Sequence, residues 1–226
     1  MAAPFNPRAW SYSAMKKYDN CPRQYAEIVV YRNYADVFSS PKGDYGDKLH
    51  KSAEAYVKGA GELDNEFKFM QPALDVLRSI PGEKHTEHKM AVGFDGTPLP
   101  WNSKDRWFQG IADLVIVGEG HTARVLDYKT GASKYADTDQ LELMSMLIFA
   151  HYPHVTKVKG RLIFVLEDTA RDRNVDRSEN ERLWEKWREK DAKRVASIEA
   201  DNFPARESGL CKKHCVVLTC AHNGRK

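Results

Sequence analysis

Hydrophobic residues recur along this chain at two spacings, and each spacing predicts a different element. A spacing of three to four residues predicts an amphipathic helix over 46–59, in which His50 lies beside the apolar stripe. The expected helices are 14–18, 24–34, 46–59, 65–80, 139–151 and 178–200. Ser11 or Ser13 is expected to cap the first of them. The helix expected over 178–200 alternates acidic and basic residues, which is typical of a solvated helix.

Short apolar runs bounded by turn residues predict the strands. The runs 109–117 and 123–130 flank the turn-like residues 118–121, so we expect them to pair as a hairpin. A strand over 86–94, which carries Glu87, precedes the hairpin, and a short strand over 161–166 follows it. This order predicts an α/β fold with a central mixed β-sheet flanked by helices.

Length and composition set broad limits on the function. The 226 residues suit a single domain over 1–226, and 42% hydrophobic residues argue against wholesale disorder. A formal net charge of +3 permits nucleic-acid binding without requiring it. No run reaches membrane-spanning length and the first residues lack an apolar signal core. We therefore expect no membrane partner and an intracellular, cytoplasmic location, which for a phage-encoded protein is the host cytoplasm.

The hairpin carries the candidate chemistry. Antiparallel pairing is expected to bring Asp113 and Asp127 close enough to share a hard cation. Strand alternation places Lys129 on the same face as Asp127. Two carboxylates and an amine suit metal-assisted phosphodiester hydrolysis. The alternative is a solvated surface pair, since Asp-x-Lys is common at strand ends, but the apolar Val125-Leu126 before it favours a cleft.

The four cysteines are distributed unevenly. Cys21 stands alone, whereas Cys211, Cys215 and Cys220 crowd the C-terminal end. A chain without an export signal keeps its thiols reduced, so this clustering indicates metal ligation more than disulfides. Four unrelated thiols are the remaining alternative.

Several short motifs follow one another in the order seen in a known nuclease family. They are Tyr12-Ser13-Ala14-Met15 with Cys21-Pro22-Arg23-Gln24-Tyr25, Gly46-Asp47-Lys48-Leu49-His50, Gly110-Ile111-Ala112-Asp113, Asp127-Tyr128-Lys129-Thr130-Gly131, and Gln140. Through them the chain resembles the PD-(D/E)XK nuclease superfamily and, within it, the RecB-like branch that includes CRISPR-adaptation and phage exonucleases. The resemblance covers most of the chain. Each motif is weak alone, but together and in this order they are specific.

The resemblance implies a restriction-endonuclease-like core and a metal-dependent deoxyribonuclease. The expected enzyme is an exonuclease on single-stranded DNA or DNA ends, in recombination, repair or phage replication. The ligands of Mg²⁺ or Mn²⁺ would be His50, Asp113, Asp127 and the main-chain carbonyl of Tyr128. Glu87 is either a further carboxylate near the metal or an exposed strand residue.

The resemblance also assigns Lys129 and Gln140 to the catalytic set with the two aspartates. Without it, Gln140 is a solvent-facing residue at a helix start and His50 a packed or surface group. Met144 departs from the family pattern, because it occupies the place of a tyrosine that acts at the DNA or the edge of the active site. That role is either missing here or falls to another aromatic residue.

In four-cysteine members of this branch the cysteines hold a 4Fe-4S cluster, which the resemblance implies for Cys21, Cys211, Cys215 and Cys220. Such a cluster would staple residues 1–35 and 201–226 into one subregion. Structural Zn²⁺ is the alternative, with His214 and His222 as substitute ligands. Basic and aromatic residues near the two ends of the chain would then form a positively charged rim that binds single-stranded DNA. Alternatively, they are ordinary solvated charges. They are Arg8, Trp10, Lys16, Lys17, Arg23, Lys212, Lys213, Arg225 and Lys226.

Two other functions stay open. The first is a catalytically inactive DNA-end-binding or adaptor protein on the same scaffold, against which the intact set His50, Asp113, Asp127 and Lys129 argues. The second is a restriction-type endonuclease, which the terminal cysteines make less attractive.

Overall fold

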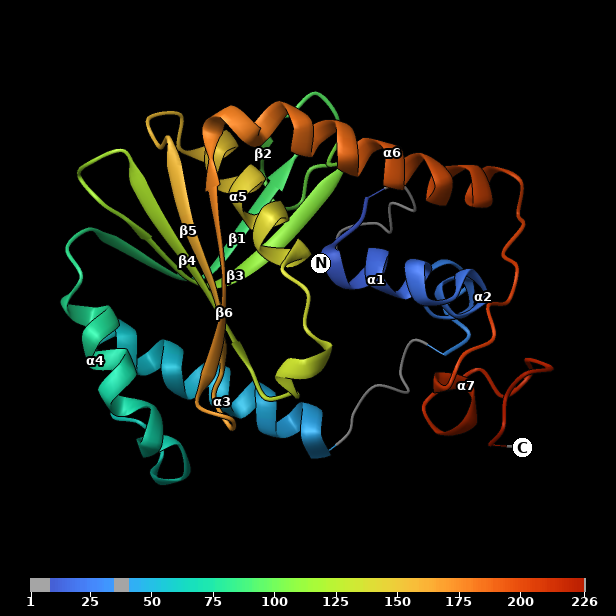
Figure 1. The fold of residues 1–226 in the computed structure, drawn as a ribbon, viewed down its shortest axis with the longest axis horizontal. Coiled ribbons are helices and arrows are strands. Elements are labelled where there is room, and N and C mark those ends of the chain that lie inside the picture. The colour runs from blue at the N-terminus through green and yellow to red at the C-terminus, as the bar shows by residue number, and fades with distance from the viewer. Residues whose placement is uncertain (1–8, 35–40, 226) are drawn as a thin grey trace. The chain divides into compact units, whose positions relative to one another are not determined.

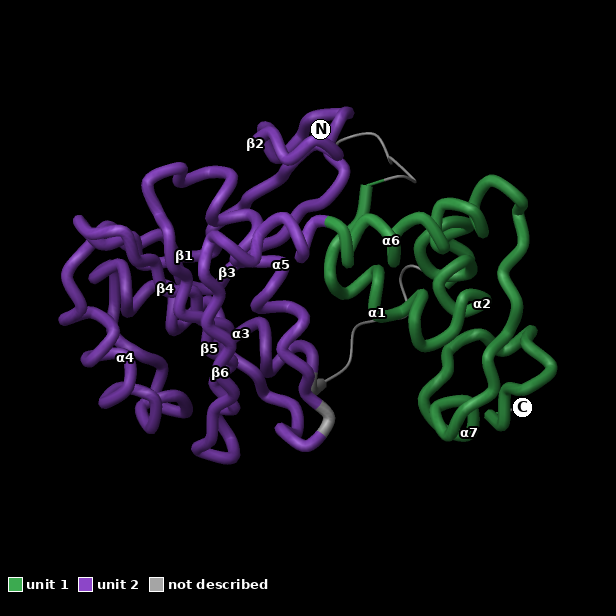
Figure 2. Tube along the Cα trace, turned by 45° about the horizontal axis from the view of Figure 1, so that its top comes forward, with its two compact units in different colours: residues 1–39, 185–226 green, residues 40–184 purple. Residues whose placement is uncertain are grey.

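The computed structural model describes residues 9–34 and 41–225, which form two compact units. Unit 1 comprises residues 1–39 and 185–226, and unit 2 comprises residues 40–184 (Figure 2). None of the helices in the described ranges is both long and apolar enough to span a membrane.

Unit 2 is built on a mixed sheet with strand order β2-β1-β3-β4-β5-β6 (Figure 1). The strands are β1 (Glu83–Val92), β2 (Pro98–Leu99), β3 (Phe108–Val117), β4 (Thr122–Lys129), β5 (Lys157–Phe164) and β6 (Thr169–Asp176). β4 and β5 pair in parallel, whereas the other pairs are antiparallel. A parallel pair needs a crossover connection, and α5 (Asp139–His151) supplies it. The predicted α/β fold with a mixed sheet flanked by helices is confirmed.

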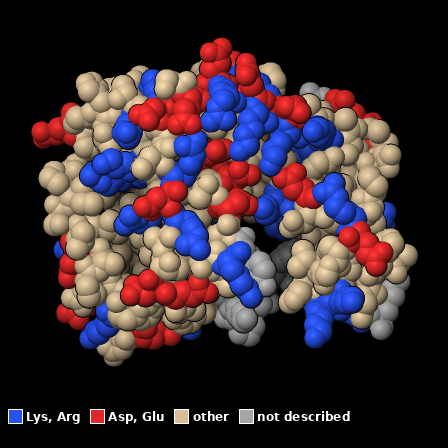
Figure 3. All heavy atoms as spheres, viewed as in Figure 1, with Lys and Arg blue, Asp and Glu red and all other residues tan. Residues whose placement is uncertain are grey.

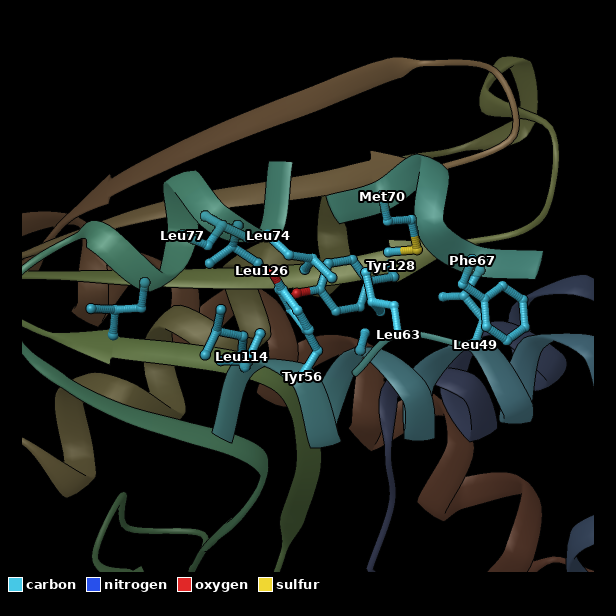
Figure 4. Packing of buried hydrophobic residues seen from close by; sticks show 13 residues of the cluster. Leu49, Tyr56, Leu63, Phe67, Met70, Leu74, Leu77, Leu114, Leu126 and Tyr128 are labelled. Atoms are coloured by element: carbon cyan, nitrogen blue, oxygen red, sulfur yellow. The ribbon is translucent and has the colours of Figure 1, made fainter. Parts of the chain in front are cut away.

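Helices cover both faces of this sheet. α3 (Pro41–Lys58), η2 (Asn65–Met70) and α4 (Gln71–Ser79) pack on one face through a buried apolar cluster (Figure 4). The cluster includes Leu49, Tyr56, Leu63, Phe67, Met70, Leu74, Leu77, Leu114, Leu126 and Tyr128. α5 covers the other face, because a Cβ atom added to Gly110 of β3 would meet Met144 and Leu147 of α5.

The alternation of side chains along the paired strands β1 and β3 is interrupted at one position. Beyond it, residues that would face one helical layer face the other. Their register pairs Thr86 with Leu114 and His88 with Ala112, and it leaves the intervening Glu87 and Asp113 unpaired. Glu87 has a φ of 46°, in the left-handed region that non-glycine residues rarely adopt. Leu114 faces α3 and α4, whereas Gly110 faces α5, although strict alternation would place both on one face. The sheet is therefore interrupted locally at two carboxylates.

Unit 1 joins the N-terminal helices to the C-terminal segment. It contains α1 (Tyr12–Asn20), α2 (Pro22–Tyr25), the π-helix η1 (Ala26–Val30), α6 (Asn180–Glu199) from residue 185 onward, and α7 (Leu210–Lys213). As expected, Ser11 caps α1, since its Oγ accepts a hydrogen bond from the Ala14 amide at 3.4 Å.

A buried ion pair within α6 reaches α2 through one further hydrogen bond in unit 1. The Arg194 side chain is fully buried and lies 2.6 Å from Asp191, and it donates to the Tyr25 hydroxyl at 2.8 Å. Losing one partner of such a pair costs about 3–5 kcal/mol, because the other charge is left buried alone. The hydrogen bond from Arg194 to Tyr25 therefore joins the buried pair of α6 to α2.

Several predicted elements need correction. β6 was not predicted, because its alternating charges suit an edge strand with a solvated face and carry little apolar signal. The predicted helix 46–59 begins earlier in the structure, because α3 starts at Pro41, a residue favoured in the first helical turn. The predicted helix 24–34 is α2 followed by η1 and ends at Val30.

Two 3₁₀ segments were also missed as separate elements. The predicted helix 65–80 consists of η2 and α4, and the predicted helix 178–200 begins with η4 (Arg177–Glu179) before α6. The hairpin was predicted to within one residue at each strand end.

Candidate functional site

Asp113 and Asp127 lie where β3 and β4 separate. The ladder between these strands runs from Val117–Ala123 to Leu114–Leu126 and stops there. Asp113 and Asp127 are the next residues of the two strands, and Asp113 also stands at the interruption opposite Glu87. The sheet thus opens at a point where three carboxylates gather.

His50, Glu87 and Asp113 form a compact group of potential ligands. One ligand atom of each lies within 4.8 Å of the other two. The imidazole Nδ1 of His50 is 3.0 Å from Oδ1 of Asp113, and Oδ2 of Asp113 accepts the amide hydrogen of Tyr128 at 2.6 Å. One nitrogen and several carboxylate oxygens are a donor set that suits Mg²⁺ or Mn²⁺.

Asp127 lies outside this trio and is held by two other residues. Gln140 of α5 donates through Nε2 to Oδ1 at 2.5 Å, and Lys129 Nζ lies 2.6 Å from Oδ2. The Lys129 ammonium is therefore the partner of Oδ2, and the buried carboxylate is held between this cation and the Gln140 amide.

The electrostatics of the site disfavour its own negative charges. Burial raises the pKa of Asp127 to about 6, and the nearby Asp113 carboxylate adds to the effect against the opposing charge of Lys129. Burial also raises the pKa of Glu87, again with a contribution from Asp113. Burial lowers the pKa of His50, but the hydrogen bond and charge of Asp113 outweigh it, so that the net pKa is raised. A divalent cation would relieve this repulsion.

Comparison with known proteins identifies the family. The sequence profile of the PD-(D/E)XK nuclease superfamily matches residues 9–220. The chain belongs to this superfamily. Its members use divalent metals, which agrees with the donor set of His50, Glu87 and Asp113. No curated protein sequence matches the chain.

Two solved structures resemble this nuclease fold at low sequence identity. One is a protein from Eubacterium rectale provisionally described as an exonuclease, with 13% identity, a TM-score of 0.54, and coverage of 91% of this chain and 86% of that one. The other is SSO0001, with 17% identity, a TM-score of 0.48, and coverage of 96% of this chain and 87% of that one. At this identity the first likeness concerns the fold alone.

The structure places the remaining predicted residues of the nuclease site as follows. Gln140 is 8% exposed and contacts Asp127, so the alternative of a solvent-facing residue is wrong. Met144 is buried and packs against Gly110 of β3, away from solvent. The Tyr128 side chain belongs to the apolar cluster with α3 and α4 (Figure 4), while its amide holds Asp113. The metal-ligand role of its carbonyl stays a prediction.

All four cysteines line one cavity in unit 1, together with Gln24, Arg206 and His222. None of them forms a disulfide. Backbone amides of Arg206 and Ser208 point at the sulfurs of Cys21 and Cys211 at 3.3 and 3.5 Å, and the Gln24 side chain donates to Cys215 at 3.7 Å. The predicted subregion 1–35 and 201–226 falls within unit 1.

The predicted basic and aromatic rim is only partly supported by exposure. Trp10 is 2% exposed and packs against Trp187, so it cannot stack on a base. Arg23 pairs with Glu27 at 2.7 Å, whereas Lys212 and Lys213 are exposed. Arg8 and Lys226 lie outside the described residues. Lysines and arginines are interspersed with acids on the face seen in Figure 3, and they form no single basic area there.

The buried charge of Asp127 is expected to destabilise the folded protein at neutral pH. A carboxyl whose pKa is raised on folding destabilises the folded state as pH rises from about 4 to 6 and beyond. With chelator present, Asp127→Asn should therefore raise the melting temperature at pH 7, and the gain should shrink as pH falls toward 4. Lys129, whose side chain is 34% exposed, can turn to solvent in the variant.

Thermal unfolding at several pH values measures this effect. Asp105→Asn, at an exposed loop position, is the control and should leave the melting temperature unchanged. A melting temperature of Asp127→Asn equal to or below that of the wild type at pH 7 would show that the ionised carboxylate of Asp127 does not destabilise the folded protein.

Proposed function

We propose that this protein is a metal-dependent deoxyribonuclease of the RecB-like branch, an exonuclease acting on single-stranded DNA or DNA ends. The observation that carries the proposal is the gathering of Glu87, Asp113, Asp127 and Lys129 where β3 and β4 part. Superfamily membership supports a nuclease that acts on DNA. The provisional exonuclease description of the Eubacterium rectale protein agrees with the finer assignment.

Each residue has a definite task in this proposal. Mg²⁺ or Mn²⁺, held by His50, Glu87, Asp113, Asp127 and the Tyr128 carbonyl, would supply Lewis-acid activation of a water and of the phosphate. Lys129 orients the attacking water or offsets charge that develops on the phosphate oxygens. Gln140 fixes the orientation of Asp127 through its 2.5 Å hydrogen bond. The Tyr128 amide does the same for Asp113.

The first test is cleavage of end-labelled single-stranded DNA with Mg²⁺, Mn²⁺ or chelator. Asp113→Ala, Asp127→Ala and Lys129→Ala should each lower the rate by two or more orders of magnitude, because each removes a ligand or charge that acts in the transition state. The control Glu62→Ala, at an exposed loop position, should cleave like the wild type. Undiminished cleavage by any of the three variants would contradict its assigned role.

Closed circular single strands separate the competing functions in the same assay. An exonuclease degrades linear DNA and spares circles, whereas a restriction-type endonuclease acts without a free end. An inactive end-binding protein retards the DNA and leaves it intact with every metal. Either of the last two results would replace the exonuclease proposal.

We further propose that Cys21, Cys211, Cys215 and Cys220 hold a structural 4Fe-4S cluster. Their shared cavity and the N–H groups directed at three of the sulfurs support it, since thiolates are stabilised by such donors. Structural Zn²⁺ held by the same thiolates, with His214 or His222 as a substitute ligand, is the alternative that the test below separates from the cluster.

Anaerobically purified protein tests the cluster. It should be brown, with visible charge-transfer absorption and about four irons per chain. Cys215→Ser should lose the colour and unfold at lower temperature, whereas the active-site variant Asp113→Ala should keep both. Colourless wild-type protein that contains stoichiometric zinc would establish the alternative metal.

A further inference from the structure

The sheet surface next to the metal ligands continues toward β2 as an ordered row of side chains. Lys89 of β1 pairs with Ile111 of β3, two residues beyond Glu87 and Asp113. β2 ends at Leu99, and Trp101 lies in the turn that follows it, with its ring centre 5.9 Å from the Lys89 ammonium. Lys89 and Ile111 thus form a row across the sheet, adjacent to the row of Glu87 and Asp113, and Trp101 extends this row beyond the end of β2.

The new row lies on the same side of the sheet as the metal ligands. Gly110 faces α5, so the alternation of β3 turns Ile111 away from α5. His50 approaches Asp113 from α3, which covers the face opposite to α5. Lys89 is close enough to Glu87 for its charge to act on that carboxyl, whose pKa is raised mainly by burial. The two rows therefore form one continuous surface.

The side chains of the row have the chemistry of a nucleotide-binding site. Lys89 is exposed, and its ammonium lies 5.9 Å from the centre of the Trp101 ring. Within the described ranges Lys89 forms no ion pair with a carboxylate. Ile111 is 37% exposed although it lies in the middle of a strand. Single-stranded DNA is bound by this combination, in which cations contact phosphates and aromatic faces stack on bases.

We propose that Lys89, Trp101 and Ile111 bind the nucleotide adjacent to the scissile phosphate of a single-stranded DNA substrate. This inference rests on the proposed nuclease function and specifies how that site holds its substrate. The base stacks on Trp101 and contacts Ile111, and Lys89 pairs with the phosphate. Two residues of a strand span about 7 Å, so the phosphate at Lys89 is a neighbour of the one at the metal ligands.

Binding without cleavage tests the subsite separately from the enzyme activity. A fluorescently labelled single-stranded oligonucleotide is titrated with full-length protein in chelator, and anisotropy is followed at several salt concentrations. Trp101→Ala should weaken binding at least five-fold, and Trp101→Phe should restore most of the affinity, because a second aromatic ring also stacks. Lys89→Ala should lower the slope of log affinity against log salt by about 0.7, because one phosphate contact is lost. Lys89→Arg should restore that slope.

Matched controls come from an exposed lysine and an exposed aromatic residue in η2. Lys68→Ala and Phe69→Ala should bind like the wild type. Thermal unfolding checks that the Lys89 and Trp101 variants are folded. An abasic oligonucleotide should bind wild type and Trp101→Ala equally, because no base is left to stack.

The outcomes separate the two proposals. Wild-type binding by Lys89→Ala and Trp101→Ala, or no binding of single strands by the wild type, would overturn the subsite. Normal cleavage with unchanged binding in these variants would leave the nuclease proposal in place and remove the subsite alone. Weakened binding in the variants without any cleavage by the wild type would support the subsite and contradict the nuclease.

Discussion

The desolvation and mutual repulsion of three neighbouring carboxylates form the constraint on which the rest of this site depends. Asp113, Asp127 and Glu87 stand together in a partly desolvated place, where Lys129 and His50 only partly offset their charge. A protein selected for stability alone would replace at least one of them. In the proposed function a divalent cation bound at the opening of the sheet would turn this repulsion into ligation.

The fold produces this arrangement through an irregularity in a regular sheet. The left-handed conformation of Glu87 and the end of the β3–β4 ladder at Leu114 expose the carboxylates together. Backbone strain of about 1–3 kcal/mol is typical of such positions, and the packed helices on both sides maintain it. The same change of face places Lys89 and Ile111 on the surface next to the proposed metal ligands.

Much of this could be predicted from the sequence, and the reasons for the exceptions are physical. The hairpin has clear apolar runs, and α5 is an apolar stretch of helical length that is buried on nearly all sides, so they and the position of Gln140 at a helix start were found. β6 was missed because an edge strand needs few apolar residues. The closeness of Glu87 to His50 depends on a backbone conformation that no propensity encodes. Nothing singled out Lys89 and Trp101 either, because their meeting depends on the register of β1 with β2.

Direct titration with Mn²⁺ tests the central claim most closely, because it measures the affinity of the site for the ion, independently of DNA cleavage. Calorimetry at pH 7.5 on the wild type should show binding, and Asp113→Asn and Glu87→Gln should each weaken it by at least ten-fold. The exposed Glu62→Gln should bind like the wild type. Wild-type protein that binds no divalent ion, or variants that bind it equally well, would contradict the account.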